Sequence, residues 1–296
     1  MLESFKSLTV ERQGVQLHTR AAGEGPPLLL LHGHPQSMAM WHRVAPVLAQ
    51  THRVVLMDLR GYGDSSRPEA DAAHTKHSKR EMALDALAVM KAHGFERFDV
   101  LAHDRGARVA HRLAVDAPVA VKRLLLLDIA PTLAMYENTS EAFARAYWHW
   151  FFMIQPSPLP EALIESSPTR YVRSVMGGRH AGLAPFAPEA LAEYERCAAL
   201  PGTAQSIAED YRASASLDLE HDRADVAVGR LLQQPLRVLW GQHGAVGRCF
   251  DVLALWRERA AQVTGREIDC GHYLAEEAPE QVLAEAQAFF THSQSD

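Results

Sequence analysis

The chain has 296 residues, of which 47% are hydrophobic and 22% are charged, and its formal net charge is −6. This composition supports a large buried core and excludes disorder as the main state, and the length fits one large α/β domain with an insertion or two small domains. The acidic balance argues against a nucleic-acid-binding protein, because such proteins usually carry a basic face, but a small anionic substrate needs only one or two local arginines.

The sequence gives no indication of a membrane, secreted or metal-binding protein. No apolar run approaches the ~20 residues of a membrane span, and the first residues lack the layout of a signal peptide. The three cysteines, Cys197, Cys249 and Cys270, are odd in number and far apart. We therefore expect a reducing, cytoplasmic location without a disulfide framework. Neither a CxxC pair nor an HExxH motif occurs, so no metal site is predicted.

The first part of the chain alternates short apolar runs with helical patterns, which is typical of a parallel sheet with crossover helices. Two segments around Gly14, Leu8–Val10 and Val15–Thr19, are predicted to form a hairpin. Four nearly continuous apolar runs follow, as expected of strands that are covered on both faces. They are Pro27–His32, Val54–Asp58, Phe98–Ala102 and Arg123–Asp128.

The rest of the chain divides into a helical part and a second α/β part. Between Leu133 and Asp225 no buried strand is predicted, and helices are expected at Thr139–Ile154, Pro188–Ala198 and Thr203–Ala213. The α/β pattern then returns with a strand at Leu236–Trp240, a helix at Phe250–Ala261, the edge of a last strand at Glu267–Asp269 and a closing helix at Pro279–Phe290. The simplest architecture is one mostly parallel sheet (1–132 and 226–296) with a helical cap (133–225) over the carboxyl ends of its strands, where such sheets bind ligands.

Asp104 lies where a predicted strand meets a predicted helix at a tight turn, with Gly106 two residues later. This is the nucleophile-elbow pattern with an aspartate in the serine position. Ala102 replaces the first glycine of the pattern, and a small residue is what the sharp turn requires. The alternative interpretation is that Asp104 is a polar strand-end residue that caps the helix.

Three further segments follow predicted strands. The turn His32–Ser37 can direct backbone N–H groups into the site, so the amides of His34 and Arg105 are predicted to form an oxyanion hole. His272 follows the last strand, where elbow hydrolases carry their base. Asp128 ends the strand after the elbow helix and is assigned to orient His272. A capping role for Asp128, or Asp251 as the acid, remains an alternative.

These motifs, in this order, resemble the α/β hydrolases that use an aspartate nucleophile. A closer resemblance, to the fluoroacetate and haloacetate dehalogenases, rests on four segments and spans nearly the whole chain. The segments are His103–Arg108, Leu127–Thr132, Ala146–Trp150 and Asp210–Arg212. The resemblance implies the α/β-hydrolase fold with a helical cap, no metal or organic cofactor, and a homodimer.

The chemistry of an aspartate nucleophile suits this resemblance. The carboxylate is already ionised at pH 7, so it can displace a leaving group from a saturated carbon without a base, and a histidine then activates water against the resulting ester. Arg105 and Arg108 lie three residues apart at the start of a helix, and guanidinium groups bind carboxylates well.

The leaving halide needs hydrogen-bond donors. By resemblance these are His149, Trp150 and Tyr211, whose imidazole, indole and phenol groups can all donate. His34 departs from the pattern, because relatives usually carry an apolar or aromatic residue there.

The sequence thus predicts a hydrolase that converts a 2-haloacetate to glycolate and halide, with Asp104 as nucleophile and His272, oriented by Asp128, as base. Its expected partner is a small anionic substrate, not a nucleic acid or a membrane. An epoxide hydrolase with the same nucleophile is the alternative. Tyr211 and Tyr147 would then donate to the epoxide oxygen, but the arginine pair would be unexplained. A non-catalytic ligand-binding homologue is the third hypothesis, since a fold does not fix a function.

Overall fold

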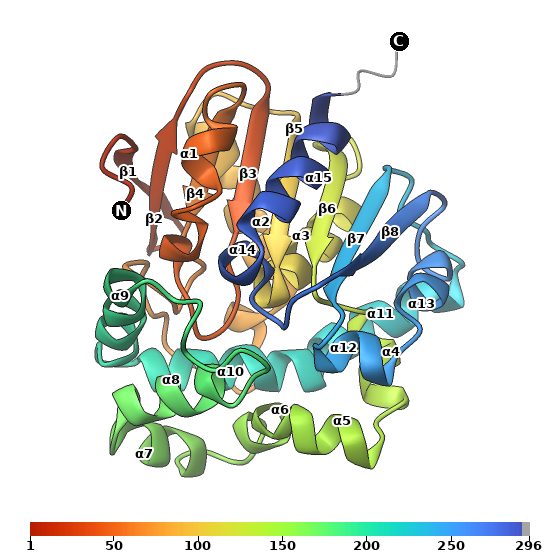
Figure 1. Ribbon diagram of the computed structural model, residues 1–296. Helices are drawn as coiled ribbons and strands as arrows, with labels where there is room; N and C mark the ends of the chain where they lie inside the picture. Colours follow the sequence, from red (N-terminus) through yellow and green to blue (C-terminus); the bar gives the residue numbers. More distant parts are fainter. Residues whose placement is uncertain (292–296) are drawn as a thin grey trace.

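The computed structural model describes residues 1–291 and is built on one eight-stranded sheet (Figure 1). The strand order is β1-β2-β4-β3-β5-β6-β7-β8. The β1–β2 and β2–β4 pairs are antiparallel and the other pairs are parallel, which confirms the predicted mostly parallel sheet. The strands are β1 (Lys6–Arg12), β2 (Val15–Ala22), β3 (Pro27–Leu31), β4 (Arg53–Met57), β5 (Phe98–His103), β6 (Val121–Leu127), β7 (Leu236–Gly241) and β8 (Val263–Ile268).

Helices cover both faces of the sheet, as the continuous apolar strands require. Alternate residues of a strand point to opposite faces. Leu28 and Leu30 of β3 therefore pack in the apolar cluster that includes α1 (Ala45–Leu48) and α15 (Pro279–Thr291). Leu29 and Leu31 pack in the cluster that includes α2 (Lys79–Ala92) and α3 (Asp104–Asp116). The smaller elements outside the region between β6 and β7 are η1 (Met38–Trp41), η2 (Thr75–His77), α12 (Ala245–Cys249), α13 (Val252–Arg257) and α14 (Leu274–Glu277).

Between β6 and β7 the described chain forms helices and no strand. We call the residues from Thr132 to Ala227 the helical insertion. Figure 1 shows it gathered below the carboxyl ends of the central strands, with α10 close beneath the sheet and α5, α6 and α7 farther away. Its helices are α4 (Thr132–Glu137), α5 (Glu141–Ala146), α6 (Trp148–Met153), α7 (Leu159–Glu165), α8 (Pro168–Gly177), α9 (Pro188–Ala198), α10 (Thr203–Ala215) and α11 (Leu217–Ala227).

Three predicted elements differ from the structure. The helix predicted at Thr139–Ile154 is two helices, α5 and α6, because Tyr147 leaves the helical conformation (φ −112°, ψ 33°) where its ring packs on Phe143. The helix predicted at Phe250–Ala261 is confined to α13. The last strand, β8, begins at Val263, before the predicted edge at Glu267–Asp269. Its first residues were not predicted as a strand, because they are partly or fully exposed and form no apolar run. At Tyr147 tertiary packing thus overrode a local helical pattern.

No helix within residues 1–291 combines the length and the apolar character that crossing a membrane requires.

Candidate active site

Asp104 occupies a strained turn between β5 and α3. Its φ is +45°, in the left-handed region that residues with a side chain rarely adopt. Two glycines make room for this turn. A Cβ on Gly106 would lie 2.3 Å from the carbonyl oxygen of His32, and one on Gly33 would lie 2.5 Å from the Cβ of Asp104. The close approach of two backbone segments, the turn after β3 and the elbow, thus explains the glycine pattern around the elbow.

The carboxylate of Asp104 faces the groups that the sequence assigned to its chemistry. Its Oδ1 accepts a hydrogen bond of 3.0 Å from the backbone N–H of His34, and its Oδ2 lies 4.0 Å from Nε2 of His272. The amide of Arg105, the other predicted oxyanion donor, lies in the first turn of α3. Asp104 is 3% exposed.

His272 is held from two sides. Its Nδ1 donates to Oδ2 of Asp128 at 2.5 Å, and the other oxygen of Asp128 accepts from the backbone N–H of Gly241 at 2.9 Å. Nε2 of His103 donates to the carbonyl oxygen of His272 at 2.8 Å. Asp251, the alternative acid, instead caps α13 by accepting from the N–H of Ala254. Asp128 is therefore the carboxylate that contacts the imidazole.

The surroundings of Asp104 keep it ionised. Burial by itself would raise the pKa of this carboxyl group. Interactions with His272, His103 and the two arginines of α3 outweigh burial and hold the pKa of Asp104 well below the usual range of an aspartate. The carboxylate is therefore charged in neutral solution, as a nucleophile in a displacement must be.

Arg105 is bound within the protein by an acidic residue of the helical insertion. Its Nε and Nη2 donate to the two carboxylate oxygens of Asp210 at 2.9 and 2.6 Å, and Nη2 also contacts Ser214. Lys79 of α2 forms an ion pair with the same carboxylate, and the hydroxyl of Tyr62 donates to it at 2.8 Å. Only Nη1 of Arg105 is buried without a hydrogen-bond partner within residues 1–291. Arg105 can therefore donate to a bound molecule from Nη1 alone, and not through two nitrogen atoms as in a bidentate guanidinium–carboxylate pair.

Arg108 has no such carboxylate. Its Nη1 donates to the hydroxyl of Thr132 at 2.8 Å and to the carbonyl oxygen of Ala130 at 3.2 Å, and its Nη2 contacts the sulfur of Met135. Within residues 1–291 no carboxylate forms an ion pair with it, and its Nε is buried without a partner. Burial lowers the pKa of Arg108, and the nearby Asp104 opposes that shift. Arg108 is a buried cation with neutral hydrogen-bond partners near the carboxylate of Asp104.

The three residues expected to bind the halide lie together in the helical insertion. His149 and Trp150 belong to α6 and Tyr211 to α10, and the ring of Tyr211 lies 5.9 Å from that of His149 and 6.4 Å from that of Trp150. The guanidinium of Arg105 lies 4.0 Å above the Tyr211 ring. The Trp150 Nε1 and the Tyr211 hydroxyl are buried, and neither has a partner in the described part of the chain.

His34 extends from the His32–Ser37 turn into this group of rings. Its imidazole stacks on His149 with 6.0 Å between centroids, and its Nε2 lies 3.0 Å from the hydroxyl of Tyr171. Burial lowers the pKa of His34 to about 3, so the ring is neutral near pH 7. A neutral imidazole therefore replaces the apolar side chain that the resemblance led us to expect.

Sequence reasoning missed several residues that contact this site. Lys79 and Asp210 complete the charge cluster around Arg105, and His103 supports the loop of His272. Asp210 was visible as part of the segment that resembles the dehalogenases, but nothing in the sequence paired it with Arg105. Arg179 lies in a stretch without a recognised motif, and it interacts electrostatically with Asp104 and Asp128.

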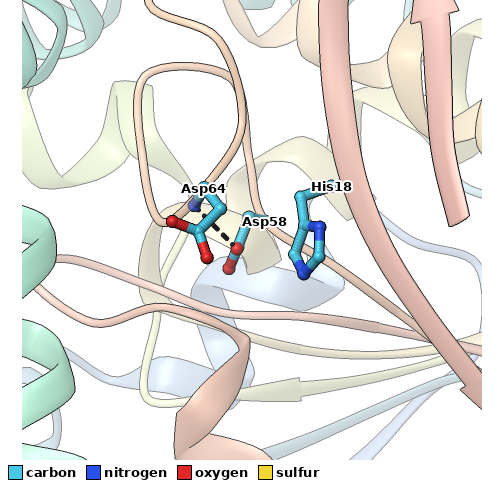
Figure 2. A group of neighbouring side chains, drawn as sticks. All are labelled: His18, Asp58 and Asp64. Atoms are coloured by element: carbon cyan, nitrogen blue, oxygen red, sulfur yellow. Dashed lines mark hydrogen bonds between the residues drawn. The ribbon is translucent and has the colours of Figure 1, made fainter. Parts of the chain in front are cut away.

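One group of side chains has the composition of a metal site. Ligand atoms of His18, Asp58 and Asp64 lie within 4.8 Å of one another, as Figure 2 shows. The protein already occupies both carboxylates. Asp58 accepts from the backbone N–H groups of Met38 and Asp64, and Asp64 pairs with Arg196 at 2.8 Å. These contacts show that the two aspartates stabilise the loop in which they lie.

Comparison with known proteins agrees with this fold. The family model of the α/β hydrolase fold matches residues 26–279. The chain belongs to the α/β-hydrolase family. A crystal structure of a Nostoc sp. PCC 7120 protein described as an α/β hydrolase superposes on it with a TM-score of 0.96 at 50% identity, covering 99% of this chain and 100% of the other.

Two enzymes with assigned activities are similar to this α/β hydrolase over almost its whole length. A fluoroacetate dehalogenase from Burkholderia sp. is 39% identical, covering 100% of this chain and 97% of the relative. A soluble epoxide hydrolase from Corynebacterium sp. (strain C12) is 33% identical, covering 94% of each chain. The resemblance to the dehalogenases is thus confirmed across the helical insertion as well as the sheet.

Proposed function

We propose that this α/β hydrolase is a cytoplasmic enzyme that cleaves the carbon–halogen bond of 2-haloacetates, giving glycolate and halide. Arg108 carries the proposal. It is a buried guanidinium one helical turn beyond the nucleophile, and its protein partners are all neutral. A buried cation whose hydrogen-bond partners are all neutral is costly, and a substrate carboxylate would supply a directly bound counter-ion. A neutral substrate such as a simple epoxide would leave Arg108 without one.

In the first step the substrate carboxylate binds Arg108 and the free Nη1 of Arg105, which brings its α-carbon to Asp104. An oxygen of Asp104 forms a bond to this carbon, while the carbon–halogen bond breaks and the halide leaves with its electron pair. The product is an ester between Asp104 and the glycolyl group. This step needs no proton transfer, because the low pKa of Asp104 keeps the nucleophile ionised.

In the second step water cleaves the ester. His272 takes a proton from water through Nε2, and the water oxygen attacks the side-chain carbonyl carbon of Asp104. The charge that develops on the carbonyl oxygen is stabilised by the N–H of His34, which already donates to Asp104 at 3.0 Å. Asp128 stabilises the imidazolium of His272. Collapse of the intermediate breaks the ester bond, and the departing glycolate oxygen takes the proton from His272. The second proton of the attacking water, left on the carboxyl group of Asp104, passes to solvent, and this restores the carboxylate.

The leaving halide would be held by His149, Trp150 and Tyr211. The indole N–H and the phenol O–H are buried and have no partner within residues 1–291, so a halide would satisfy both donors. Fluoride leaves poorly because its charge is concentrated. It therefore gains more than chloride from compact, fixed donors.

The test is halide and glycolate release from fluoroacetate and chloroacetate, with the wild type and Asp104→Asn in parallel. We expect release by the wild type and a loss of about 10⁴-fold or more in the variant. Single turnover in ¹⁸O-labelled water should place the label in Asp104, since water attacks the carbonyl carbon of that residue. Absence of release from both haloacetates would refute the proposal.

Epoxide hydrolysis is the second candidate, favoured by the hydroxyls of Tyr147 and Tyr211. Both are buried without partners in the described chain, and two such donors could protonate an epoxide oxygen. Arg108→Gln separates the two functions. The substitution should suppress haloacetate turnover, whereas turnover of a neutral epoxide would not depend on this charge.

A further inference from the structure

A strongly basic cavity adjoins the catalytic histidine. It has a volume of about 240 Å³, and its nine lining residues include two arginines and three histidines but no carboxylate. One of the histidines is His272, so the cavity and the proposed catalytic site share a wall. The lining residues are Ala146, Gly178, Arg179, His180, His243, Gly244, Ala245, Arg248 and His272.

Arg179 follows α8 and extends over the ring of Tyr147, with 4.6 Å from its guanidinium carbon to the ring centroid. Its Nη1 makes one long contact of 3.4 Å with the carbonyl oxygen of Ala146. In residues 1–291 no carboxylate lies within ion-pair distance of Arg179. Burial would lower the pKa of this arginine, but Tyr147, Tyr273 and the site's two carboxylates outweigh burial and raise it. Arg179 therefore stays charged beside the site without a direct counter-ion.

Arg248 lies on α12 on the other side of the cavity and is exposed. It too has no carboxylate within ion-pair distance in the described chain. Many other exposed arginines of this protein form an ion pair with a carboxylate. Arg145 pairs with Glu141, and Arg196 pairs with Glu193 and Asp64. Of the lining histidines, His243 pairs with Asp269 at 2.7 Å, so the positive charge without an ion-pair partner in the cavity, within residues 1–291, is that of Arg179 and Arg248.

We propose that this cavity is an anion-binding port, in which Arg179 and Arg248 hold a small monocarboxylate on its way to and from Asp104. The proposal rests on the proposed function, which requires an anionic substrate to approach an anionic nucleophile. A cavity lined by one sign of charge raises the local concentration of the opposite ion and speeds its association. The same charges hold the carboxylate product after the ester is cleaved.

The arrangement of the groups suits a carboxylate in transit. Guanidinium groups bind carboxylates through directed N–H donors, and the five N–H donors of Arg179 exceed its contacts with the carbonyl oxygen of Ala146 and the side chain of Tyr273. The shared residue, His272, forms the boundary between the cavity and the nucleophile, since its Nε2 lies 4.0 Å from Asp104. An anion held in the port would therefore lie on the other side of the His272 imidazole from Asp104.

The first experiment is steady-state kinetics on chloroacetate at low and high ionic strength. Arg179→Gln and Arg248→Gln should each lower kcat/KM by about 3- to 10-fold at low salt, through KM, and the defect should shrink at high salt because screening weakens steering. Arg179→Lys, which keeps the charge, should retain most of the wild-type kcat/KM. Arg145→Gln is the matched control. It removes one exposed positive charge from α5, outside the cavity, and should leave kcat/KM unchanged.

The outcomes separate a port from a structural role. If Arg179→Gln lowered kcat rather than raising KM, or if Arg179→Lys failed to restore kcat/KM, Arg179 would act through packing and the port would be rejected. A normal kcat/KM in Arg248→Gln would also reject it. Because Arg248 is exposed, loss of folding is not expected to obscure that result.

The second experiment does not depend on turnover. Crystals of the wild type and of Arg179→Gln soaked in bromide should differ, with anomalous scattering in the cavity between Arg179 and Arg248 in the wild type only. Bromide in the cavity without haloacetate turnover would refute the proposed function and leave an anion site. Turnover without bromide in the wild-type cavity would refute the port and leave the proposed function standing.

Discussion

The two walls of the candidate site differ in how their polar atoms are satisfied. On the sheet side, the proposed acid–base pair is held by protein partners, and the unpartnered buried donors of α3 are Nη1 of Arg105 and Nε of Arg108, the two arginines proposed to bind the substrate. Asp128 binds both Gly241 and His272, and His103 binds the carbonyl oxygen of His272. On the side of the helical insertion, the Trp150 Nε1 and the Tyr211 hydroxyl are buried without partners within residues 1–291.

This difference indicates that the two walls of the site have different roles. Reactive groups work best when fixed hydrogen bonds hold them in place before the substrate arrives. A buried donor without a partner is destabilising by about 1–3 kcal/mol, so such donors persist where a ligand completes them. We infer that the sheet side performs the chemistry and that the insertion side recognises the leaving group. The following predictions test this contrast, beginning with the largest effect.

Asp128→Asn should cause the largest loss on the sheet side. The amide cannot stabilise a charged His272 and favours the wrong tautomer, so turnover should fall by about 10⁴-fold. The first step needs no base, and one equivalent of halide should still be released in a rapid burst. Rapid-quench halide measurement tests this, and loss of the burst together with turnover would contradict the two-step scheme.

Asp210→Asn should cause the largest loss of stability. Asp210 is fully buried and binds both Arg105 and Lys79, so the substitution would leave two buried cations poorly compensated. Breaking a buried ion pair from one side costs about 3–5 kcal/mol. Urea unfolding measures the cost. Glu141→Gln is the control, because its partner Arg145 is exposed and the free energy of unfolding should change by less than about 1 kcal/mol.

Arg108→Gln should weaken substrate binding without a comparable loss of stability, since the partners of Arg108 are neutral. Losing charged hydrogen bonds of about 1.5–3 kcal/mol corresponds to a KM about 10- to 100-fold higher for chloroacetate. Arg108→Lys should fall between the wild type and Arg108→Gln, because lysine keeps the charge but not the planar fork. Unchanged KM values in both variants would place the carboxylate elsewhere.

Tyr211→Phe tests the unpartnered donors directly. Removing this hydroxyl should leave the free energy of unfolding unchanged or higher, because it has no partner in the described protein, and should lower fluoroacetate turnover about 2- to 10-fold. The control is Tyr194→Phe. That hydroxyl donates to Glu276 at 3.1 Å, so its loss should destabilise the protein by about 1 kcal/mol and spare activity. A destabilised Tyr211→Phe protein would contradict the contrast between the two walls.

His34→Phe should change the pH dependence of stability and leave stability at neutral pH least affected. Burial lowers the pKa of His34 to about 3, so between about pH 6.5 and pH 3 the unfolded chain binds a proton at this residue and the folded protein does not. Stability is therefore lost as the pH falls through this range. The phenylalanine variant should lose about 1.4 kcal/mol less per pH unit there. Urea midpoints at pH 7 and pH 5 measure the slope, and equal slopes would show that His34 is protonated in the folded protein.

Much of the fold could be predicted because its signals are local. Continuous apolar runs such as Pro27–Leu31 identify strands that are covered on both faces, and Pro188 marks the start of α9. The division of α5 from α6 at Tyr147 could not be predicted, because it depends on packing against Phe143. β8 was placed too late because an edge strand alternates exposure and lacks an apolar run.

The sequence by itself determined the class of chemistry. An aspartate at a strand-to-helix elbow, a histidine after the last strand and glycines around the turn are recognisable from spacing alone, because sharp turns admit few residue types. Only the tertiary structure decided how the charges are shared. Asp210 neutralises Arg105 and leaves Arg108 without a carboxylate, and Arg179 joins the site from a segment without a motif. Electrostatic interactions depend on distance and burial in three dimensions, and neither can be read from positions along a chain.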